Sequence, residues 1–399
     1  MKREKAFVKA HLGDDVRTLA LQAGRYPDMD MPWALQQIAG WQTAKEKLPT
    51  WAAIDAVEYP VHLSMEQCSS EQTAHYKARL AQRLLRDGQQ LLDLTGGLGV
   101  DCSFMARHFH SAIYVEQNET LCQLAQHNFA ALGLAHIQVV HSTAEAFLST
   151  LAPQDSTLIY LDPARRDAAG TRTYSIEDCT PNLLQMKAAL LQAANVVMAK
   201  LSPMLDWHRA VEQLDEGGRC VAEVHIVATK NECKELILIL KKDAAEPLAL
   251  YCINDEQEEI FHPAADSTNS AAAPMPQPAE LLYVPNAAVM KSGCFAQLAQ
   301  RYALAAAAEH SHLFFSNQIE KKFPGRVFRI ERTSTMNKKE LRAFLAGVER
   351  ANIAVRNFPL TAQQLKSRLR LSDGGDQYIF ATTLADGTHQ LFLCQKISE

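Results

Sequence analysis

The chain has 399 residues, of which 47% are hydrophobic and 21% charged, a composition typical of a globular protein with several domains. Its apolar runs are too short for a membrane span, and the opening stretch MKREKAFVKAHLGDD lacks the apolar core of a signal peptide, so we expect a cytoplasmic protein. The nine cysteines are scattered without a C-x-x-C pair, which argues against a disulfide framework and a zinc site. Because His108-x-His110 and His310-x-His312 lack further ligands, we expect no metal.

Charge is distributed unevenly along the chain. The formal net charge is −5, yet residues 320–370 hold thirteen Lys or Arg against four Glu, a local excess of nine positive charges. Such segregation is typical of modules that bind polyanions, RNA among them. A helix surface solvated by lysines is the plainer alternative.

The first part of the chain has helical spacing. Residues 1–64 predict a small helical region in which Pro32 and Pro49 mark element boundaries. The stretch SEQTAHYKARLAQRLL then predicts an amphipathic helix, with Ser69 or Ser70 as its N-cap and Asp87-Gly88 as its end.

A change of pattern marks the central domain, which we place at residues 65–242. Short apolar runs alternate with helical stretches, and the runs are QLLDLTG, SAIYVEQ, HIQVVHS, TLIYLDP and NVVMAKLSP. Two consecutive strands, CVAEVHIVA and ELILILKK, follow them. This order predicts an α/β fold with a doubly wound, mostly parallel sheet of seven strands that closes with a hairpin.

The tail predicts two small α+β domains, at residues 243–330 and 331–399. The first contains a flexible insertion at 263–279, rich in Pro, Ala and Ser, followed by the strand ELLYVPN, one helix over AAVMKSGCFAQLAQRYAL and the strand GRVFRIER. The second contains a helix capped by Thr361 and two strands joined through Asp386-Gly387, and it carries most of the positive charge.

The first strand of the central domain enters a glycine-rich turn that fits a nucleoside cofactor. The turn reads Asp93-Leu94-Thr95-Gly96-Gly97-Leu98-Gly99, and Cys stands at position 102, where a dinucleotide site has its third glycine. A carboxylate at position 93 disfavours a pyrophosphate. It suits the cationic sulfonium and amino groups of S-adenosylmethionine, which has no phosphate. We therefore expect Asp93, Thr95, Gly96, Gly97 and Gly99 to contact that cofactor.

The next two strand ends supply the rest of the expected cofactor site. Glu116 follows Gly97 by nineteen residues, the distance at which an acid accepts the ribose hydroxyls, and Gln117 comes directly after it. After the third strand, HSTAEAF places Thr143 and Glu145 near the expected adenine amine. Tyr76 and Lys77, on the preceding helix, are expected to cover the methionine end, with simple packing of the helix on the sheet as the alternative.

Together these residues resemble the class I S-adenosylmethionine-dependent methyltransferases, more specifically the bacterial branch that carries a C-terminal THUMP-like domain. The resemblance lies in EQCSSEQTAHYKARL, LLDLTGGLGVD, LDPARRD, YVPNAAVMKSG and LRLSDGGDQYIFATT, and it covers most of the chain beyond about residue 60. It implies a Rossmann-like methyltransferase domain followed by ferredoxin-like and THUMP-like domains. It also implies an RNA substrate, with transfer RNA foremost and ribosomal RNA as the other class, bound through the basic region 320–370.

The turn LDPARRD supplies the expected catalytic residues. Related amino-methylating enzymes carry an [Asp/Asn]-Pro-Pro-aromatic turn that holds an exocyclic amine, and Asp162 and Pro163 match that turn while Ala164 and Arg165 do not. We expect Asp162, Pro163, Arg165 and Tyr174 to form the catalytic site, with Tyr174 stacking on the target base, and methyl transfer to a base nitrogen.

Several alternatives stay open from the sequence. Arg165 also resembles the Asp-Pro-Pro-Arg turn of carbon-5 uridine methyltransferases, which need a cysteine nucleophile; Cys179 is the nearest thiol, and a buried small residue is its plainer interpretation. Lys200, just past the fifth strand, either faces the pocket or is solvated. The enzyme could also methylate a protein or a small molecule, or the chain could be a non-catalytic binder.

Overall fold

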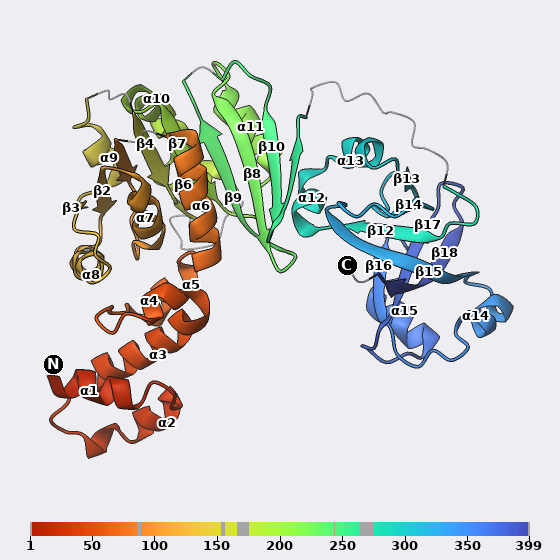
Figure 1. Cartoon of the computed structure of the whole chain (residues 1–399), viewed down its shortest axis with the longest axis horizontal. Coiled ribbons are helices and arrows are strands. Elements are labelled where there is room, and N and C mark those ends of the chain that lie inside the picture. Colours follow the sequence, from red (N-terminus) through yellow and green to blue (C-terminus); the bar gives the residue numbers. More distant parts are fainter. Residues whose placement is uncertain are drawn as a thin grey trace. The chain divides into compact units, whose positions relative to one another are not determined.

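The computed structural model describes residues 2–86, 89–152, 156–165, 175–242, 244–263 and 275–397. The chain forms two compact units (Figure 1). The first consists of Met1–Val224 with Glu235–Glu246, and the second of His225–Lys234 with Pro247–Glu399. Each unit is described by itself below.

The N-terminal region is helical, as the spacing predicted. Its α-helices are α1 (Lys2–Ala10), α2 (Val16–Leu21), α3 (Met31–Lys47), α4 (Pro49–Ala52) and α5 (His62–Gln67). Helix α3 begins after Asp30, whose carboxylate accepts a hydrogen bond from the backbone N–H of Trp33 at 3.0 Å. A small core holds these helices together, formed by Phe7, Leu19, Met31, Ala34 and Ile38.

The central sheet contains the predicted seven strands. Five of them are parallel and adjacent in the order β3-β2-β1-β4-β7: β1 (Gln90–Asp93), β2 (Ser111–Glu116), β3 (Ile137–His141), β4 (Thr157–Leu161) and β7 (Val196–Leu201). Strand β9 (Glu232–Leu240) pairs antiparallel with β7, and β8 (Val221–Thr229) lies on its far side. Every residue of β4 is buried, as expected for a central parallel strand covered on both faces.

Helices flank this sheet and connect its strands (Figure 1). They are α6 (Glu71–Leu84), α7 (Val100–Met105), α8 (Glu119–Ala131), α9 (Ala144–Leu148), α10 (Leu183–Ala193) and α11 (Trp207–Asp215). Ser70 is the N-cap of α6, because its side chain accepts from the N–H of Thr73.

Two further strands that the sequence did not predict extend the sheet to nine. They are β10 (Ala249–Asn254) and β11 (Gln257–Phe261), which pair with each other and place β10 beside β8. The acidic stretch NDEQEE lies beyond the predicted strands, and it contains a tight turn at Asp255, with φ +53°, between β10 and β11.

The second sheet has seven strands, in the order β13-β14-β12-β15-β18-β17-β16. They are β12 (Leu281–Pro285), β13 (Ala305–Ala306), β14 (Phe314–Ser316), β15 (Gly325–Thr335), β16 (Asn352–Arg356), β17 (Gln377–Thr383) and β18 (His389–Lys396). Strand β15 pairs with β12 through its first half and with β18 through its second. The boundary that we placed after residue 330 therefore falls inside β15, and one continuous sheet joins the two small domains.

Helices α14 (Lys338–Phe344) and α15 (Ala362–Leu369) contribute to one of the two cores of this sheet, with Phe344, Leu365 and Leu369 buried in it. The predicted cap at Thr361 is present and forms a capping box with Gln364. The two strands joined through Asp386-Gly387 form the predicted hairpin.

The prediction of a single helix after β12 is wrong, because the structure has two helices there. Gly293 adopts φ +74° and ends α12 (Ala287–Ser292), so a separate helix α13 (Phe295–Arg301) follows. Of the insertion expected at 263–279, residues 264–274 lie outside the described residues. Met275 and Ala279 pack against a core of the second sheet, so the end of that segment belongs to the folded domain.

In the described part of the chain, no helix is both long enough and apolar enough to cross a bilayer.

Candidate active site

Four chemically active side chains belong to one edge of the parallel sheet. Asp93 ends β1 and Glu116 ends β2, Asp162 directly follows β4, and Lys200 is the penultimate residue of β7. Because β2, β1, β4 and β7 are parallel neighbours, their carboxyl ends meet at the same edge. Ligands of open α/β folds bind at this edge.

The glycine turn after β1 requires glycine for steric reasons. A Cβ on Gly96 would lie 2.1 Å from Cε2 of Tyr114, and Gly99 combines φ +81° with a virtual Cβ only 2.8 Å from Cζ of Phe129. The Tyr114 hydroxyl donates a hydrogen bond to the carbonyl oxygen of Gly97 at 2.5 Å, which fixes the turn against β2. The backbone of the turn can therefore approach a ligand closely.

Glu116 is tied to the glycine turn in a way the sequence did not reveal. Its Oε2 accepts from the N–H of Gly97 at 2.9 Å, and its Oε1 accepts from the N–H of Asn118 at 2.8 Å. Each oxygen retains a second lone pair for another donor. The carboxylate is thus fixed in orientation and still able to accept the two hydroxyls of a ribose.

Asp93 lies beneath the turn, with a relative exposure of 1%. The N–H of Thr95 donates to its Oδ1 at 3.1 Å. Burial raises the pKa of the Asp93 carboxyl well above its ordinary value, and the neighbouring acids Asp101, Asp162 and Glu116 raise it further. This site therefore favours a ligand that brings positive charge.

The turn that holds the residues expected beside the adenine begins next to Glu116. The N–H of Ser142 donates to the carbonyl oxygen of Glu116 at 3.1 Å, which brings the turn after β3 to the end of β2. The Thr143 hydroxyl caps α9 by accepting from the N–H of Ala146 at 3.2 Å. Glu145 and Gln117 are exposed.

Asp162 is held from two sides. Its backbone N–H donates to the Thr95 hydroxyl at 2.6 Å, and its Oδ2 lies 2.5 Å from Nζ of Lys200. The side chain of Asp162 is 35% exposed and that of Lys200 is 13% exposed, so Asp162 is the more accessible member of the pair. Pro163 is buried.

Lys200 is a residue at this edge whose position the sequence left undecided, and the structure places it beside Asp162. Burial lowers the pKa of its ammonium group, but the carboxylates of Asp162, Glu235 and Asp101 outweigh burial, and the net direction is upward. The cation is therefore stable beside Asp162 in the structure described here. A lysine among apolar residues near the end of a strand, as in VVMAKL, is the signal that could have identified it.

The segment after Asp162 folds back as a two-stranded ribbon. Strand β5 (Ala164–Arg165) pairs antiparallel with β6 (Cys179–Thr180), so Arg165 and Cys179 are backbone partners. Cys179 is 3% exposed. The side chain of Arg165 and all of Tyr174 lie outside the described residues, and their expected roles stay predictions.

Lys77 belongs to a buried ionic cluster. Its Nζ lies 2.6 and 2.7 Å from the carboxylate oxygens of Glu235, 2.9 Å from the Ser69 hydroxyl and 3.2 Å from Asp101 Oδ1. The Tyr160 hydroxyl donates to the other Asp101 oxygen at 2.7 Å. Because the Lys77 side chain is fully buried, we do not include it among the cofactor contacts, whereas Tyr76 beside it is half-buried.

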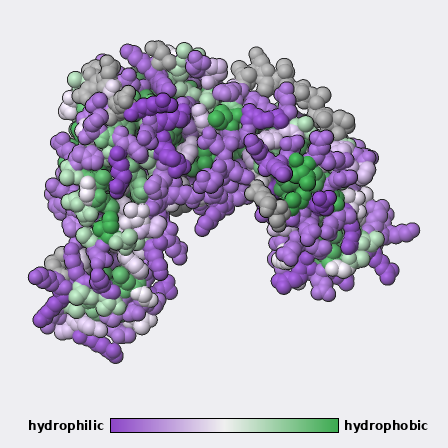
Figure 2. All heavy atoms as spheres, in the orientation of Figure 1, coloured by the Kyte–Doolittle hydropathy of each residue, from purple (hydrophilic) through white to green (hydrophobic). Residues whose placement is uncertain are grey.

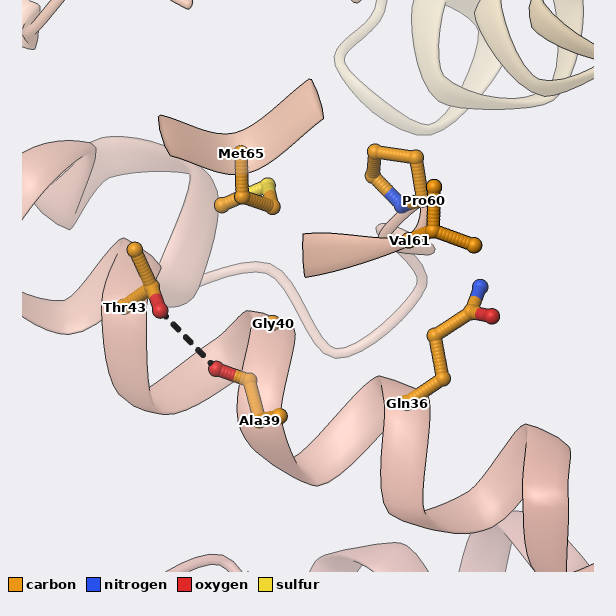
Figure 3. A pocket seen from close by; sticks show the side chains of 7 residues that line it. All are labelled: Gln36, Ala39, Gly40, Thr43, Pro60, Val61 and Met65. Atoms are coloured by element: carbon orange, nitrogen blue, oxygen red, sulfur yellow. Dashed lines mark hydrogen bonds between the residues drawn. The ribbon is translucent and has the colours of Figure 1, made fainter. Parts of the chain in front are cut away.

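A separate pocket lies within the N-terminal helical region, formed by α3, residues 60–61 and α5 (Figure 3). The side chains that line it are uncharged: Gln36, Ala39, Gly40, Thr43, Pro60, Val61 and Met65. The Thr43 hydroxyl is already used, since it donates to the carbonyl oxygen of Ala39 at 3.1 Å. Without an acid, a base or a nucleophile, this pocket is not the candidate active site.

Comparison with protein families assigns the strands of the second sheet to two domains. Residues 281–324 match the model of a ferredoxin-like domain, and residues 325–396 match that of a THUMP domain-like family. No curated protein matches the chain.

One solved structure shares the fold over nearly the whole chain. A methyltransferase candidate of Porphyromonas gingivalis W83 is 30% identical with a TM-score of 0.84, over 99% of this chain and 98% of that chain. An rRNA methylase of Streptococcus thermophilus (13% identity, TM-score 0.33, 42% of this chain and 95% of that one) is a far weaker match. So is an O-methyltransferase of Bacillus cereus in complex with SAH (15%, 0.35, 54% and 100%). The first match, the sheet order and the THUMP-like domain agree: this chain belongs to the class I S-adenosylmethionine-dependent methyltransferases with a C-terminal THUMP-like domain.

Proposed function

We propose that this protein transfers a methyl group from S-adenosylmethionine to RNA, with transfer RNA as the first substrate to test. The observation that carries the proposal is the sheet edge itself, where the glycine turn, Glu116 and Asp93 adjoin the Asp162–Lys200 pair. The donor supplies an activated methyl group. The protein must hold the acceptor in line with it.

The residues at the edge fit the donor chemically. Glu116 has free lone pairs for the ribose hydroxyls, and the turn from Gly96 to Gly99 admits a ligand close to the backbone. Buried Asp93 favours a cation, which suits a sulfonium or amino group and disfavours a phosphate. In this proposal Thr143 and Glu145, which follow β3, face the base of the donor.

The THUMP-like domain supplies a basic surface. Arg332 donates to the carbonyl oxygens that end α14, while Arg350 and Lys366 are bound to Asp373. Lys338, Lys339 and Arg342 on α14 are exposed, and hydrophilic residues gather over this helix (Figure 2). These three cations are therefore open to phosphates, while the other three maintain the fold.

Binding of a transfer RNA pool at increasing salt tests the RNA assignment. Replacing Lys338, Lys339 and Arg342 by alanine should weaken binding and reduce the slope of log K against log salt by about 2 to 3, since each lost phosphate contact removes about 0.7 to 0.9. A control of equal charge loss on the N-terminal helices (Lys2, Arg3 and Arg17, all exposed) should bind like the wild type. Equal effects of both triples would refute this surface.

Transfer of labelled methyl groups tests the reaction. RNA from cells that lack the gene should accept label from S-adenosylmethionine in the presence of the purified protein. Label that enters the protein or small-molecule fraction instead would favour the alternative substrates. Failure to bind either the donor or its demethylated product at millimolar concentration would refute the function.

A further inference from the structure

We propose that Met204, in the turn after β7, is the side chain on which the target base of the RNA packs. This inference deepens the proposed function and rests on it. A base has two faces, so Met204 on one face leaves the other to the stacking contact predicted for Tyr174.

The Asp-Pro turn by itself holds a base only at its edge. Asp162 can accept a hydrogen bond from a base N–H, but a base held by such a bond alone can still tilt about it. Bases outside a double helix are fixed by contact of their faces with protein side chains. Ala164 and Arg165 follow Pro163, so the turn lacks the aromatic ring that serves this purpose in the related enzymes. An apolar side chain from another segment can take its place.

Such a side chain is present at the same edge of the sheet. In the described part of the chain, four large hydrophobic residues are exposed: Leu21, Val61, Ile319 and Met204. The first two belong to the N-terminal helical region, and the third belongs to the second unit. Met204 is 66% exposed and follows β7 at the carboxyl edge of the parallel sheet, where Asp162 and Lys200 also lie.

The backbone that carries Met204 is fixed. The N–H of Leu205 donates to the carbonyl oxygen of Ser202 at 3.1 Å and closes a β-turn, and the N–H of Met204 donates to the Ser202 hydroxyl at 3.1 Å. Pro203 restricts the backbone of this turn at its second position. Leu205 and Trp207 are each 3% exposed and anchor the chain beyond the turn. The turn is therefore held in place while the side chain at its third position stays exposed.

Contacts on both sides of the turn connect it to Asp162. The turn begins two residues after Lys200, whose Nζ lies 2.5 Å from Asp162 Oδ2. Helix α11 follows the turn, and its Arg209 lies 3.7 Å from Glu177 while its Gln213 donates a hydrogen bond to the same carboxylate. Glu177 directly precedes the ribbon strand β6, which pairs with β5 just after the Asp-Pro pair. The segment after β7 and the ribbon after β4 are therefore neighbours beside Asp162.

Methionine suits contact with a base. Its thioether is polarisable and makes favourable contacts with aromatic rings, and its unbranched side chain adapts to a purine or a pyrimidine. It adds no charge beside the Lys200 ammonium, whose pKa the surrounding carboxylates raise. An exposed methionine on an arbitrary loop needs no explanation. Its place at the edge that holds Asp162 assigns the role here.

Methyl transfer to a transfer RNA pool, taken from cells that lack the gene, is the first test. Met204→Ala should raise the KM for RNA by about 2- to 10-fold, the range that a methionine–aromatic contact contributes. The kcat and the KM for S-adenosylmethionine should stay near the wild-type values, because the contact holds substrate and transition state alike. A wild-type KM for RNA in Met204→Ala would overturn this inference and leave the proposed function intact. A wild-type protein that labels no RNA would overturn both.

Two further variants separate base packing from a structural role. Met204→Leu keeps an apolar side chain of similar volume and should keep most of the affinity for RNA. Leu21→Ala removes an exposed apolar side chain outside the site, so it is the matched control and should have the wild-type KM. All three variants should unfold at the wild-type free energy, because the replaced side chains are exposed. A KM in Met204→Leu as high as in Met204→Ala would overturn the apolar contact.

Oxidation of methionine gives a readout independent of turnover. Dilute peroxide converts accessible methionines to the sulfoxide, and mass spectrometry of peptides measures the rate at each position. The rate at Met204 should fall when the transfer RNA pool binds in the presence of S-adenosylhomocysteine, and S-adenosylhomocysteine alone should leave it unchanged. Met29, which packs against the core of the N-terminal helices, is the internal control and should keep its rate. An equal rate at Met204 with and without bound RNA would overturn the inference.

Discussion

The buried cluster around Lys77 allows a sharp test of how burial controls the energy of an ion pair. Lys77 lies 2.6 Å from Glu235 with side-chain exposures of 0% and 4%, and Lys9 lies 2.6 Å from Asp55 with exposures of 71% and 77%. The two pairs have the same separation and differ in solvation. Lys77→Met leaves Glu235 and Asp101 buried without their cation, which we expect to reduce the free energy of unfolding by about 3 to 5 kcal/mol. Lys9→Met should leave it unchanged within error.

Urea unfolding, followed by circular dichroism at neutral pH, measures both variants. The double variant Lys77→Met with Glu235→Gln should recover part of the loss, because only Asp101 then remains without its partner. Asp101 also makes the effect depend on pH. Burial opposes ionisation of Asp101, but Lys77, Lys200 and two hydroxyl donors outweigh it and hold the pKa below its ordinary value. Its contribution is therefore present above the unfolded pKa and is lost as pH falls through the folded one. Equal losses in Lys77→Met and Lys9→Met would refute the reasoning.

Three further changes concern the expected donor site. Asp93→Asn should raise the free energy of unfolding of the ligand-free protein, and the gain should increase as pH rises above about 4, because the raised pKa of Asp93 makes its ionisation costly in the folded state. The same change should weaken donor binding. Denaturation across pH measures the first effect, and calorimetry measures the second. Gly96→Ala should reduce the free energy of unfolding by about 1 to 3 kcal/mol through its clash with Tyr114, and it should abolish binding of S-adenosylhomocysteine. Gly24→Ala is the control and should have neither effect, since nothing lies within 4 Å of its added Cβ. Thr95→Val leaves the N–H of Asp162 without its acceptor and should reduce the free energy of unfolding by about 1 to 3 kcal/mol. It should slow methyl transfer and leave binding of the product unchanged. A loss of binding equal to the loss of rate would contradict this prediction.

The local patterns of the sequence predicted much of the fold, because they are set by residues close together in the chain. The alternation of apolar runs and helical stretches from Gln90 to Leu240 predicted the seven strands. The caps at Ser70 and Thr361 followed from side chains three residues away from their partners. Failures occurred where a single backbone conformation decides, as at Gly293, which divides one expected helix into two.

The sequence could place the expected donor site for the same reason. Asp93, the three glycines and Glu116 lie at strand ends whose spacing is visible in the sequence. The structure added the interactions that fix these residues, such as the hydrogen bond from the Gly97 N–H to Glu116. The residues themselves could be proposed without knowing which distant segments are neighbours in the fold.

By itself, the sequence determined the class of fold and the place where a nucleoside donor is expected. Only the tertiary structure decided the electrostatics around Asp162, Lys200 and Lys77. Lys200 stands 38 residues from Asp162, and Lys77 stands 158 residues from Glu235. Strand order, which no local pattern encodes, places β7 beside β4 and β9 beside β7, so that these charges meet. Burial then makes the attraction within each pair strong, because the surrounding chain excludes the water that would screen it. Burial also makes the loss of one partner costly, because the other charge is left without solvent.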